Sequence, residues 1–145
     1  MIAIASDHGG FAMKNQLIAH LKEQGVALED MGCYSEESVD YPIYAEKLAR
    51  AVAAGTYEKG ILVCGTGIGM SIAANKICGV RAALVADCYS AEMTRQHNDA
   101  NVLCLGGRTI GPELAKRIAD IFLKTPFSGA ENHTRRVAMI GELDK

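Results

Sequence analysis

The apolar residues of this chain switch repeatedly between short continuous runs and helical spacing. The runs predict five β-strands, over 1–6, 26–32, 60–64, 80–86 and 101–107. The third run, "GILVC", is the most apolar and is bounded by glycines, as suits a strand covered on both faces. Helical spacing predicts helices between the strands and after the last one, over 13–21, 42–54, 70–77, 89–96 and 112–123, with a final amphipathic segment over 134–143.

Alternation of strands and helices is typical of an α/β fold with a parallel sheet. We therefore expect a Rossmann-like, doubly wound, five-stranded parallel sheet with helices on both faces. A C-terminal helix follows within one domain over 1–145. If the strand order resembles 2-1-3-4-5, the first and third strands flank the switch point, where such sheets bind ligands. The segment "SDHGG" then faces "CGTGIG" across one crevice.

Composition narrows the functional classes. Of the 145 residues, 49% are hydrophobic and 22% charged, which is typical of a globular protein with a sizeable core. A net charge of -2 without a run of Lys or Arg argues against a nucleic-acid partner. No apolar segment reaches the length of a membrane span, and the first residues lack the basic region of a signal peptide, so we expect a cytoplasmic protein.

The five cysteines also carry information. They are odd in number and scattered, and no C-x-x-C pair points to zinc or to a redox centre. We expect reduced thiols, most of them buried, and no metal site. The five are Cys33, Cys64, Cys78, Cys88 and Cys104.

The segment "CGTGIG" combines a thiol with three alternate glycines before a predicted helix. Its glycines let backbone N–H groups face a ligand, and the helix start favours negative charge. It has neither the G-K-[ST] ending of a Walker loop nor the G-x-G-x-x-G spacing of a dinucleotide site. Cys64, next to these donors, is a candidate thiolate base or nucleophile. The structural alternative is a tight strand-to-helix turn with a small core cysteine.

Two kinds of chemistry could use such a thiolate. A phosphatase with a cysteine nucleophile needs C-x5-R, but the arginine position is Met70 here, which removes the bidentate clamp. The other use is proton abstraction next to a carbonyl, with the amides of residues 65–69 stabilising the enediolate oxygen. The sequence favours the second.

Further candidates lie near the predicted strand ends and helix ends. Asp7 and His8 leave the first strand at the switch point, where polar residues have few purely structural reasons to be. His97 ends the fourth helix in "TRQHND" and is a weaker candidate, because a lone helical histidine is more often a surface residue. His20 and Asp40 receive no functional role.

Six motifs in order through nearly the whole chain resemble the ribose-5-phosphate isomerase type B family. They are "SDHGGF", "DYP", "CGTGIGMSIAANK", "R-A", "YSAEMTRQHNDANVL" and "GGRTIG". The related galactose-6-phosphate isomerase subunits are less similar, since they generally lack "RQHND". The resemblance implies interconversion of D-ribose 5-phosphate and D-ribulose 5-phosphate, a step of the pentose phosphate pathway. It proceeds through an enediolate, without metal or cofactor.

The resemblance also implies roles for single residues. The base falls on Cys64, and the histidine that opens the furanose ring falls on His97, assisted by Thr66. Asp7 and His8 would hold hydroxyls and phosphate. Members are homodimers, in which the histidine segment and arginines of one subunit complete the crevice of the other; a tetramer stays open. The remaining substrate-binding positions are Gly65, Thr66, Gly67, Ile68, Gly69, Asn98, Arg108 and Arg136.

The tail departs from the family pattern. Members usually have "GGRH" and then another arginine, whereas this chain reads "SGAENHTRRV". Arg136 keeps the second arginine position. The first falls on Asn132 or Glu131, and His133 or Arg135 could replace it.

The changed phosphate clamp keeps two alternatives open. A six-carbon substrate such as allose 6-phosphate is one, and a module that only binds a sugar phosphate is the other. The intact Cys64 and His97 argue against pure binding, because binding alone needs neither a base nor a group that opens the ring.

Overall fold

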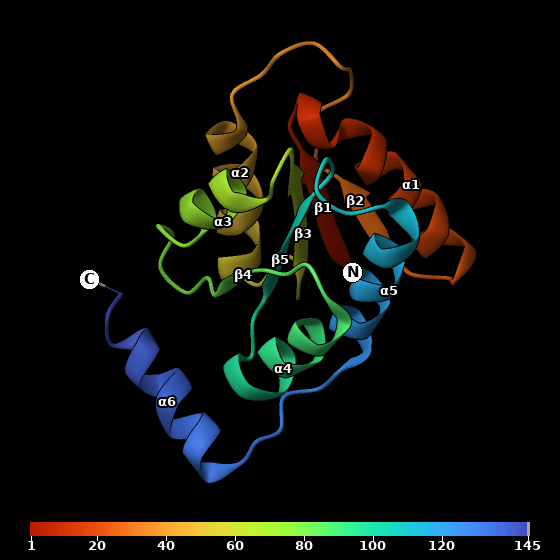
Figure 1. Ribbon diagram of the computed structural model, residues 1–145. Helices are drawn as coiled ribbons and strands as arrows, with labels where there is room; N and C mark the ends of the chain where they lie inside the picture. The colour runs from red at the N-terminus through yellow and green to blue at the C-terminus, as the bar shows by residue number, and fades with distance from the viewer. Residues whose placement is uncertain (145) are drawn as a thin grey trace.

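A computed structural model describes residues 1–144. Its centre is a five-stranded sheet in the order β2-β1-β3-β5-β4, with every pair of neighbours parallel (Figure 1). A short 3-10 helix, His8–Gly10, follows the first strand. The strands are β1 (Ile2–Ser6), β2 (Leu28–Asp30), β3 (Gly60–Cys64), β4 (Ala82–Leu84) and β5 (Val102–Gly106). The helices are α1 (Phe11–Glu23), α2 (Tyr41–Ala53), α3 (Ile68–Ala74), α4 (Cys88–Asn98), α5 (Pro112–Lys124) and α6 (Glu131–Gly141).

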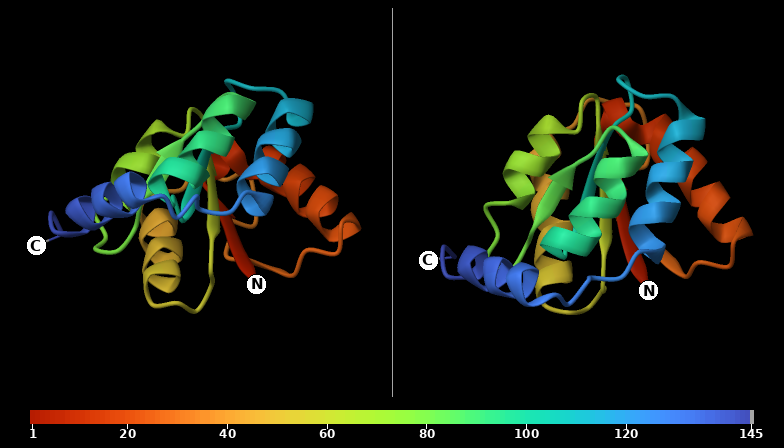
Figure 2. Two further views of the ribbon diagram at one scale, coloured as in Figure 1. Left: turned by 90° about the horizontal axis from the view of Figure 1, so that it is seen from below. Right: turned by 60° about the horizontal axis from the view of Figure 1, so that its bottom comes forward.

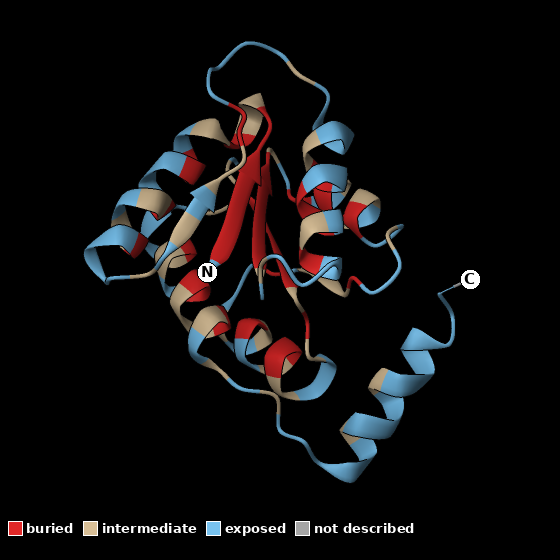
Figure 3. Ribbon diagram, turned by 180° about the vertical axis from the view of Figure 1, so that it is seen from behind, coloured by how far each residue is buried: buried red, intermediate tan, exposed pale blue. Residues whose placement is uncertain are grey.

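Helices cover both faces of the sheet, as predicted (Figure 2). One core cluster lies between the sheet and α1, α4 and α5, and the other lies beneath α2 and α3. The three central strands are buried along their whole length, in contrast to α6 (Figure 3). Four of the six buried strand side chains that face α2 and α3 are small, which lets these helices pack close to the sheet. These are Ala3, Ala5, Cys64 and Cys104.

The expected order 2-1-3-4-5 is wrong at one edge of the sheet. β5, not β4, pairs with β3, and β4 forms the edge. The physical reason is burial. "VLCLG" is apolar at every position and suits a central strand, whereas the pairing of β4 covers only three residues, two of intermediate exposure and one exposed. β1 and β3 are neighbours, which confirms the expectation that the first and third strands flank the switch point.

The central strands end level with one another. Ser6 of β1 is opposite Val63, and Cys64 of β3 is opposite Gly106. Because the strands are parallel, the loops that follow them all leave from the same edge. This carboxyl edge therefore gathers "SDHGG", "CGTGIG" and "GGR" at one place.

The last helix stands apart from the main body. α6 is joined to it by residues 125–130 and packs beside α4 (Figure 1). None of its residues is buried, and Met139, Ile140 and the following Leu143 are 58%, 43% and 79% exposed. Within residues 1–144, no helix is long and apolar enough to cross a membrane.

Candidate active site

Two loops meet closely at the carboxyl edge of the sheet. A Cβ placed on Gly9 would lie 3.2 Å from the backbone nitrogen of Gly65, so a larger residue would push the loops apart. The segments after β1 and β3 therefore face one another at the carboxyl ends of these strands, as the sequence predicts. Asp7 and His8 lie on one side, and the loop from Cys64 to Gly67 lies on the other.

Cys64 is the last residue of β3 and is buried beneath these loops, with 5% of its surface exposed. The backbone N–H of Gly67 donates a hydrogen bond to its Sγ over 3.1 Å. A contact of this kind stabilises a thiolate. By contrast, Cys104 lies deep in the neighbouring strand β5, where burial and the nearby Cys64 raise the pKa of its thiol.

The turn that presents the amides depends on glycine. Gly67 has a φ of 79°, in the left-handed region, and a Cβ there would lie 2.8 Å from the carbonyl carbon of Leu105. Both observations require glycine at this position. Thr66 accepts a hydrogen bond from the N–H of Ile68 through its Oγ1, over 3.2 Å. Since α3 has only seven residues, individual N–H groups contribute more here than a summed helix dipole.

Asp7 and His8 are both held by backbone amides. Asp7 is 7% exposed and accepts a hydrogen bond from Gly10 N–H over 3.1 Å. The Nδ1 of His8 accepts a hydrogen bond from Val39 N–H over 3.1 Å. A neutral His8 in this arrangement carries its proton on Nε2, so that nitrogen is a donor.

A buried lysine, which sequence reasoning missed, holds the loop that provides Val39. Lys14 is fully buried and donates from Nζ to Asp30 Oδ1 over 2.7 Å and to the Cys33 carbonyl over 2.6 Å. It ties α1 to the start of the loop between β2 and α2. The signal was present in the sequence, because Lys14 lies at helical spacing from Leu17 and Leu21 on the apolar face of α1.

Arg108 lies beside the same loop. Its backbone N–H donates to the Gly65 carbonyl over 2.9 Å. Its exposed side chain also lies beside Gly65, because a Cβ added to that glycine would be 3.4 Å from Nη1. The guanidinium therefore borders the amide loop. Arginine in this position offers a planar, charged donor to a phosphate.

In the same chain, His97 and Asn98 lie at the other end of the strands, where β4 and β5 begin. They end α4, and the Asn98 carbonyl accepts a hydrogen bond from Arg81, immediately before β4 begins. The next strand starts with Val102 opposite Gly60, four residues before Cys64 in β3. Four strand residues span about 13 Å, so one chain does not bring His97 to its own Cys64.

The start of α6 joins this second group. The rings of His133 and His97 lie with centroids 4.4 Å apart, and His133 Nδ1 lies 2.7 Å from Ser128 Oγ. Desolvation, and then the charges of His97 and Arg136, lower the pKa of His133. Arg136 is exposed on α6. So are the other tail candidates, Glu131, Asn132 and Arg135.

The candidate residues of one chain thus form two groups, one at the carboxyl ends of the strands and one at their amino ends. The first, which we call the thiol group, contains Asp7, His8, the loop 64–69 and Arg108. The second, the histidine group, contains His97, Asn98, His133 and Arg136. His20 lies outside both, in a 2.9 Å contact with Asp120 between α1 and α5. Within residues 1–144, no three His, Cys, Asp or Glu side chains gather as a metal site would require.

Comparison with known proteins places these observations in a family. A sequence profile described as Ribose/Galactose Isomerase matches residues 2–140. The chain is 49% identical over 144 residues to ribose-5-phosphate isomerase B of Escherichia coli strain K12, covering 99% of this chain and 96% of that protein. It is 45% identical over 144 residues to ribose-5-P isomerase B of Listeria innocua, with 99% and 97% covered.

Solved structures agree closely with the fold. Ribose-5-phosphate isomerase B of Clostridium thermocellum superimposes with a TM-score of 0.96 at 48% identity, covering 99% of this chain and 96% of that one. The Mycoplasma genitalium ribose-5-phosphate isomerase B, solved with bound ribulose-5-phosphate, gives a TM-score of 0.93 at 41% identity, with 99% and 95% covered.

Proposed function

The chain belongs to the ribose/galactose isomerase family, and from that premise we propose that it is an aldose–ketose isomerase that interconverts D-ribose 5-phosphate and D-ribulose 5-phosphate. The observation that carries the proposal is Cys64. Its Sγ accepts a hydrogen bond from Gly67 N–H, and the loop that follows it lies beside the segment after β1 and beside the Arg108 side chain. A base surrounded by donors for a developing oxyanion suits proton transfer next to a carbonyl.

The reaction has a simple proton balance. The Cys64 thiolate removes the C2 proton of the open-chain aldose, a C1–C2 double bond forms, and the C1 carbonyl oxygen becomes the enediolate oxygen. The amide groups of residues 65–69 stabilise that oxygen. The thiol then returns the proton to C1, and the proton of the C2 hydroxyl passes to the C1 oxygen, so that C2 becomes the ketone and C1 carries the hydroxyl group.

The other residues of the thiol group bind the substrate. The Asp7 carboxylate accepts from sugar hydroxyls. The Nε2–H of His8 donates to a substrate oxygen, because Val39 N–H occupies Nδ1. Arg108 pairs with the phosphate. Thr66 assists the opening of the ring.

The histidine group acts on a second copy of the chain. His97 opens the furanose ring, Asn98 binds the sugar, and Arg136 pairs with the phosphate in the partner's crevice. Their distance from the Cys64 of their own chain supports a shared site. The proposal therefore includes a homodimer, and it places the enzyme in the cytoplasm.

A panel of phosphorylated aldoses tests the proposal. Purified protein is assayed for ketose formation from ribose 5-phosphate, allose 6-phosphate and galactose 6-phosphate, with and without EDTA. We expect the highest kcat/KM for ribose 5-phosphate and no effect of EDTA. A higher kcat/KM for a hexose phosphate would move the assignment to six-carbon substrates. Tight binding without turnover would make the protein a sugar-phosphate sensor.

A further inference from the structure

The turn that ends α4 has an unusual backbone. Asp99 has a φ of 46°, and it is the only non-glycine residue with a positive φ among residues 1–144. An L-residue adopts this conformation at a cost, although Asp and Asn tolerate it better than most. The residue directly follows His97 and Asn98, the last two residues of α4, and its conformation ends the helical turn that carries both.

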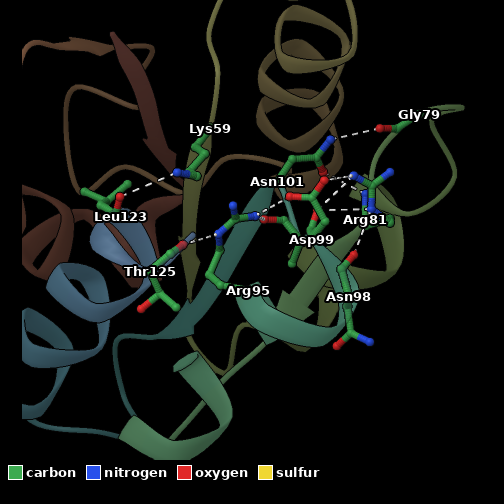
Figure 4. Close-up of polar contacts among 10 residues, drawn as sticks. Lys59, Gly79, Arg81, Arg95, Asn98, Asp99, Asn101, Leu123 and Thr125 are labelled. Atoms are coloured by element: carbon green, nitrogen blue, oxygen red, sulfur yellow. Dashed lines mark hydrogen bonds and ion pairs between the residues drawn. The ribbon is translucent and has the colours of Figure 1, made fainter. Parts of the chain in front are cut away.

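Arg81, immediately before β4, holds this turn by hydrogen bonds from one side (Figure 4). Its Nε donates to the carbonyls of Asn98 and Asp99 over 3.0 and 3.1 Å, and its Nη2 donates to the Asp99 carbonyl over 2.8 Å. Its own backbone N–H donates to Asn101 Oδ1 over 2.8 Å. The guanidinium fork thus fixes two successive peptide groups at once, which a single ammonium group could not do.

Arg95, on α4 itself, holds the turn by hydrogen bonds from the other side. Its Nη1 donates to Asp99 Oδ1 over 2.9 Å and to the Ala100 carbonyl over 2.6 Å. Its Nε donates to the Thr125 carbonyl over 3.0 Å, and only 6% of the residue is exposed. The Asp99 carboxylate balances both guanidiniums, since Arg81 Nη2 lies 3.5 Å from its Oδ2.

A link between a helix and a strand does not by itself need two guanidiniums. A glycine would adopt the same backbone without help. What the arrangement adds is a fixed direction for the two residues before the turn, and both are exposed. In Figure 4 the Asn98 side chain points away from the cluster, with no contact drawn to it.

We propose that Arg81, Arg95 and Asp99, the Asp99 clamp, are positioning residues that hold His97 and Asn98 in the orientation needed to enter the partner's crevice. This inference rests on the proposed function. The clamp touches neither substrate nor Cys64. It acts by fixing the backbone that carries the group for ring opening, and small misplacements of such groups are costly to rate.

The test uses Arg81→Met in the full-length protein, with Arg81→Lys as a second variant. The side chain of Arg81 is 25% exposed, so this substitution disturbs the core less than one at Arg95. We expect kcat/KM for ribose 5-phosphate to fall by about tenfold or more. At saturating ribulose 5-phosphate, exchange of the C1 proton with deuterated solvent should persist, because that step needs Cys64 but no ring opening. Arg81→Lys should lose most of the same activity, since lysine lacks the fork.

A double-mutant cycle separates positioning from general weakening of the fold. In a His97→Asn background, Arg81→Met should lower kcat for ribose 5-phosphate little further. Arg50→Met is the matched control, because it removes an exposed ion pair with Glu46 on α2, and it should behave as the wild type. Independent, additive losses, or loss of solvent exchange in step with isomerisation, would overturn the inference. So would an Arg81→Lys enzyme with wild-type rates.

Failure of the proposed function is recognised separately. It would appear as a wild-type protein that neither isomerises ribose 5-phosphate nor exchanges the ribulose 5-phosphate proton. Amide hydrogen exchange at Asp99 and Ala100 then decides whether the clamp holds the turn, because it does not depend on activity. We expect both amides to exchange faster in Arg81→Met than in Arg50→Met, and equal rates would contradict the clamp.

Discussion

At the scale of single residues, the thiol group combines one reactive atom with a backbone shaped around it. Cys64 ends a fully buried strand, so its position is fixed by the sheet, while Gly67 turns its N–H back toward the sulfur. The chemistry and the conformation therefore depend on different residues. Substitutions at these two positions should have different consequences.

Cys64→Ala should abolish isomerisation and solvent exchange of the substrate proton while leaving the fold and sugar-phosphate binding largely intact. The thiolate acts in the transition state, whereas backbone amides and Arg108 bind the ground state. Calorimetric binding and a deuterium exchange assay measure the two effects. Cys78→Ala, which removes an exposed thiol, is the control and should keep full activity. Retained exchange in Cys64→Ala would exclude Cys64 as the base.

Gly67→Ala should destabilise the fold by about 2 kcal/mol or more and raise KM. The left-handed backbone costs about 1–2 kcal/mol for an L-residue, and the added Cβ overlaps the Leu105 backbone. Gly55→Ala is a matched control, because Gly55 has the same φ of 79° but nothing within 4 Å of the added Cβ. Urea unfolding of both variants should show the smaller loss for Gly55→Ala. Equal losses would mean that the Leu105 contact does not matter.

At the scale of elements, α6 is held to the body by few contacts. His133 packs against His97 of α4, Ser128 Oγ lies beside His133, and the Ser128 N–H donates to the Gln96 carbonyl over 3.2 Å. The imidazole pair is thus one of the contacts that attach the helix carrying Arg136. Another is the Gly79 N–H, which donates to Asp144 Oδ2 just after this helix over 2.7 Å.

This attachment should weaken on acidification. The pKa of His133 is lowered in the folded protein, first by desolvation and then by His97 and Arg136, so the folded state binds that proton less tightly than the unfolded chain. The stability that His133 contributes is present above the ordinary histidine pKa of about 6.5 and is lost as the pH falls below it. Amide exchange in α6 should therefore speed up relative to α5 between about pH 7.5 and 5.5. A His133→Phe variant, which keeps a ring but cannot titrate, should lose most of this pH dependence; an unchanged dependence would contradict the role of His133.

At the scale of the whole molecule, the thiol group lies at the carboxyl ends of the strands and the histidine group at their amino ends. In the proposed dimer, each crevice takes Cys64 from one chain and His97 from the other. The rigid sheet keeps the two groups of one chain apart, and only a second copy can bring complementary groups together.

Complementation between inactive variants tests this arrangement. Cys64→Ala and His97→Asn proteins are mixed, unfolded and refolded together. If the site is shared, half of the dimers are mixed, and each mixed dimer has one site with both residues intact. About one quarter of wild-type activity on ribose 5-phosphate should return. Each variant refolded alone is the control. No recovery, with mixed dimers shown to be present by mass spectrometry, would mean that Cys64 and His97 act within one chain.

The sequence by itself determined the alternation of strands and helices, the switch point between the first and third strands, and the thiol beside a glycine turn. It did so because these features depend on local apolar periodicity and on backbone freedom at single residues. Most cysteines were expected to be buried, and Cys33, Cys64 and Cys104 are.

Only the tertiary structure decided which strand lies at the edge, where His97 lies relative to Cys64, and which buried groups hold the site in place. The placement of β4 depends on competition between two strands for the centre of the sheet, which no local pattern records. The roles of Lys14, Arg81 and Arg95 depend on carbonyls that are distant in sequence, such as those of Cys33 and Thr125. From the sequence alone, a charged side chain is expected to be solvated. Only the fold shows which backbone groups surround it.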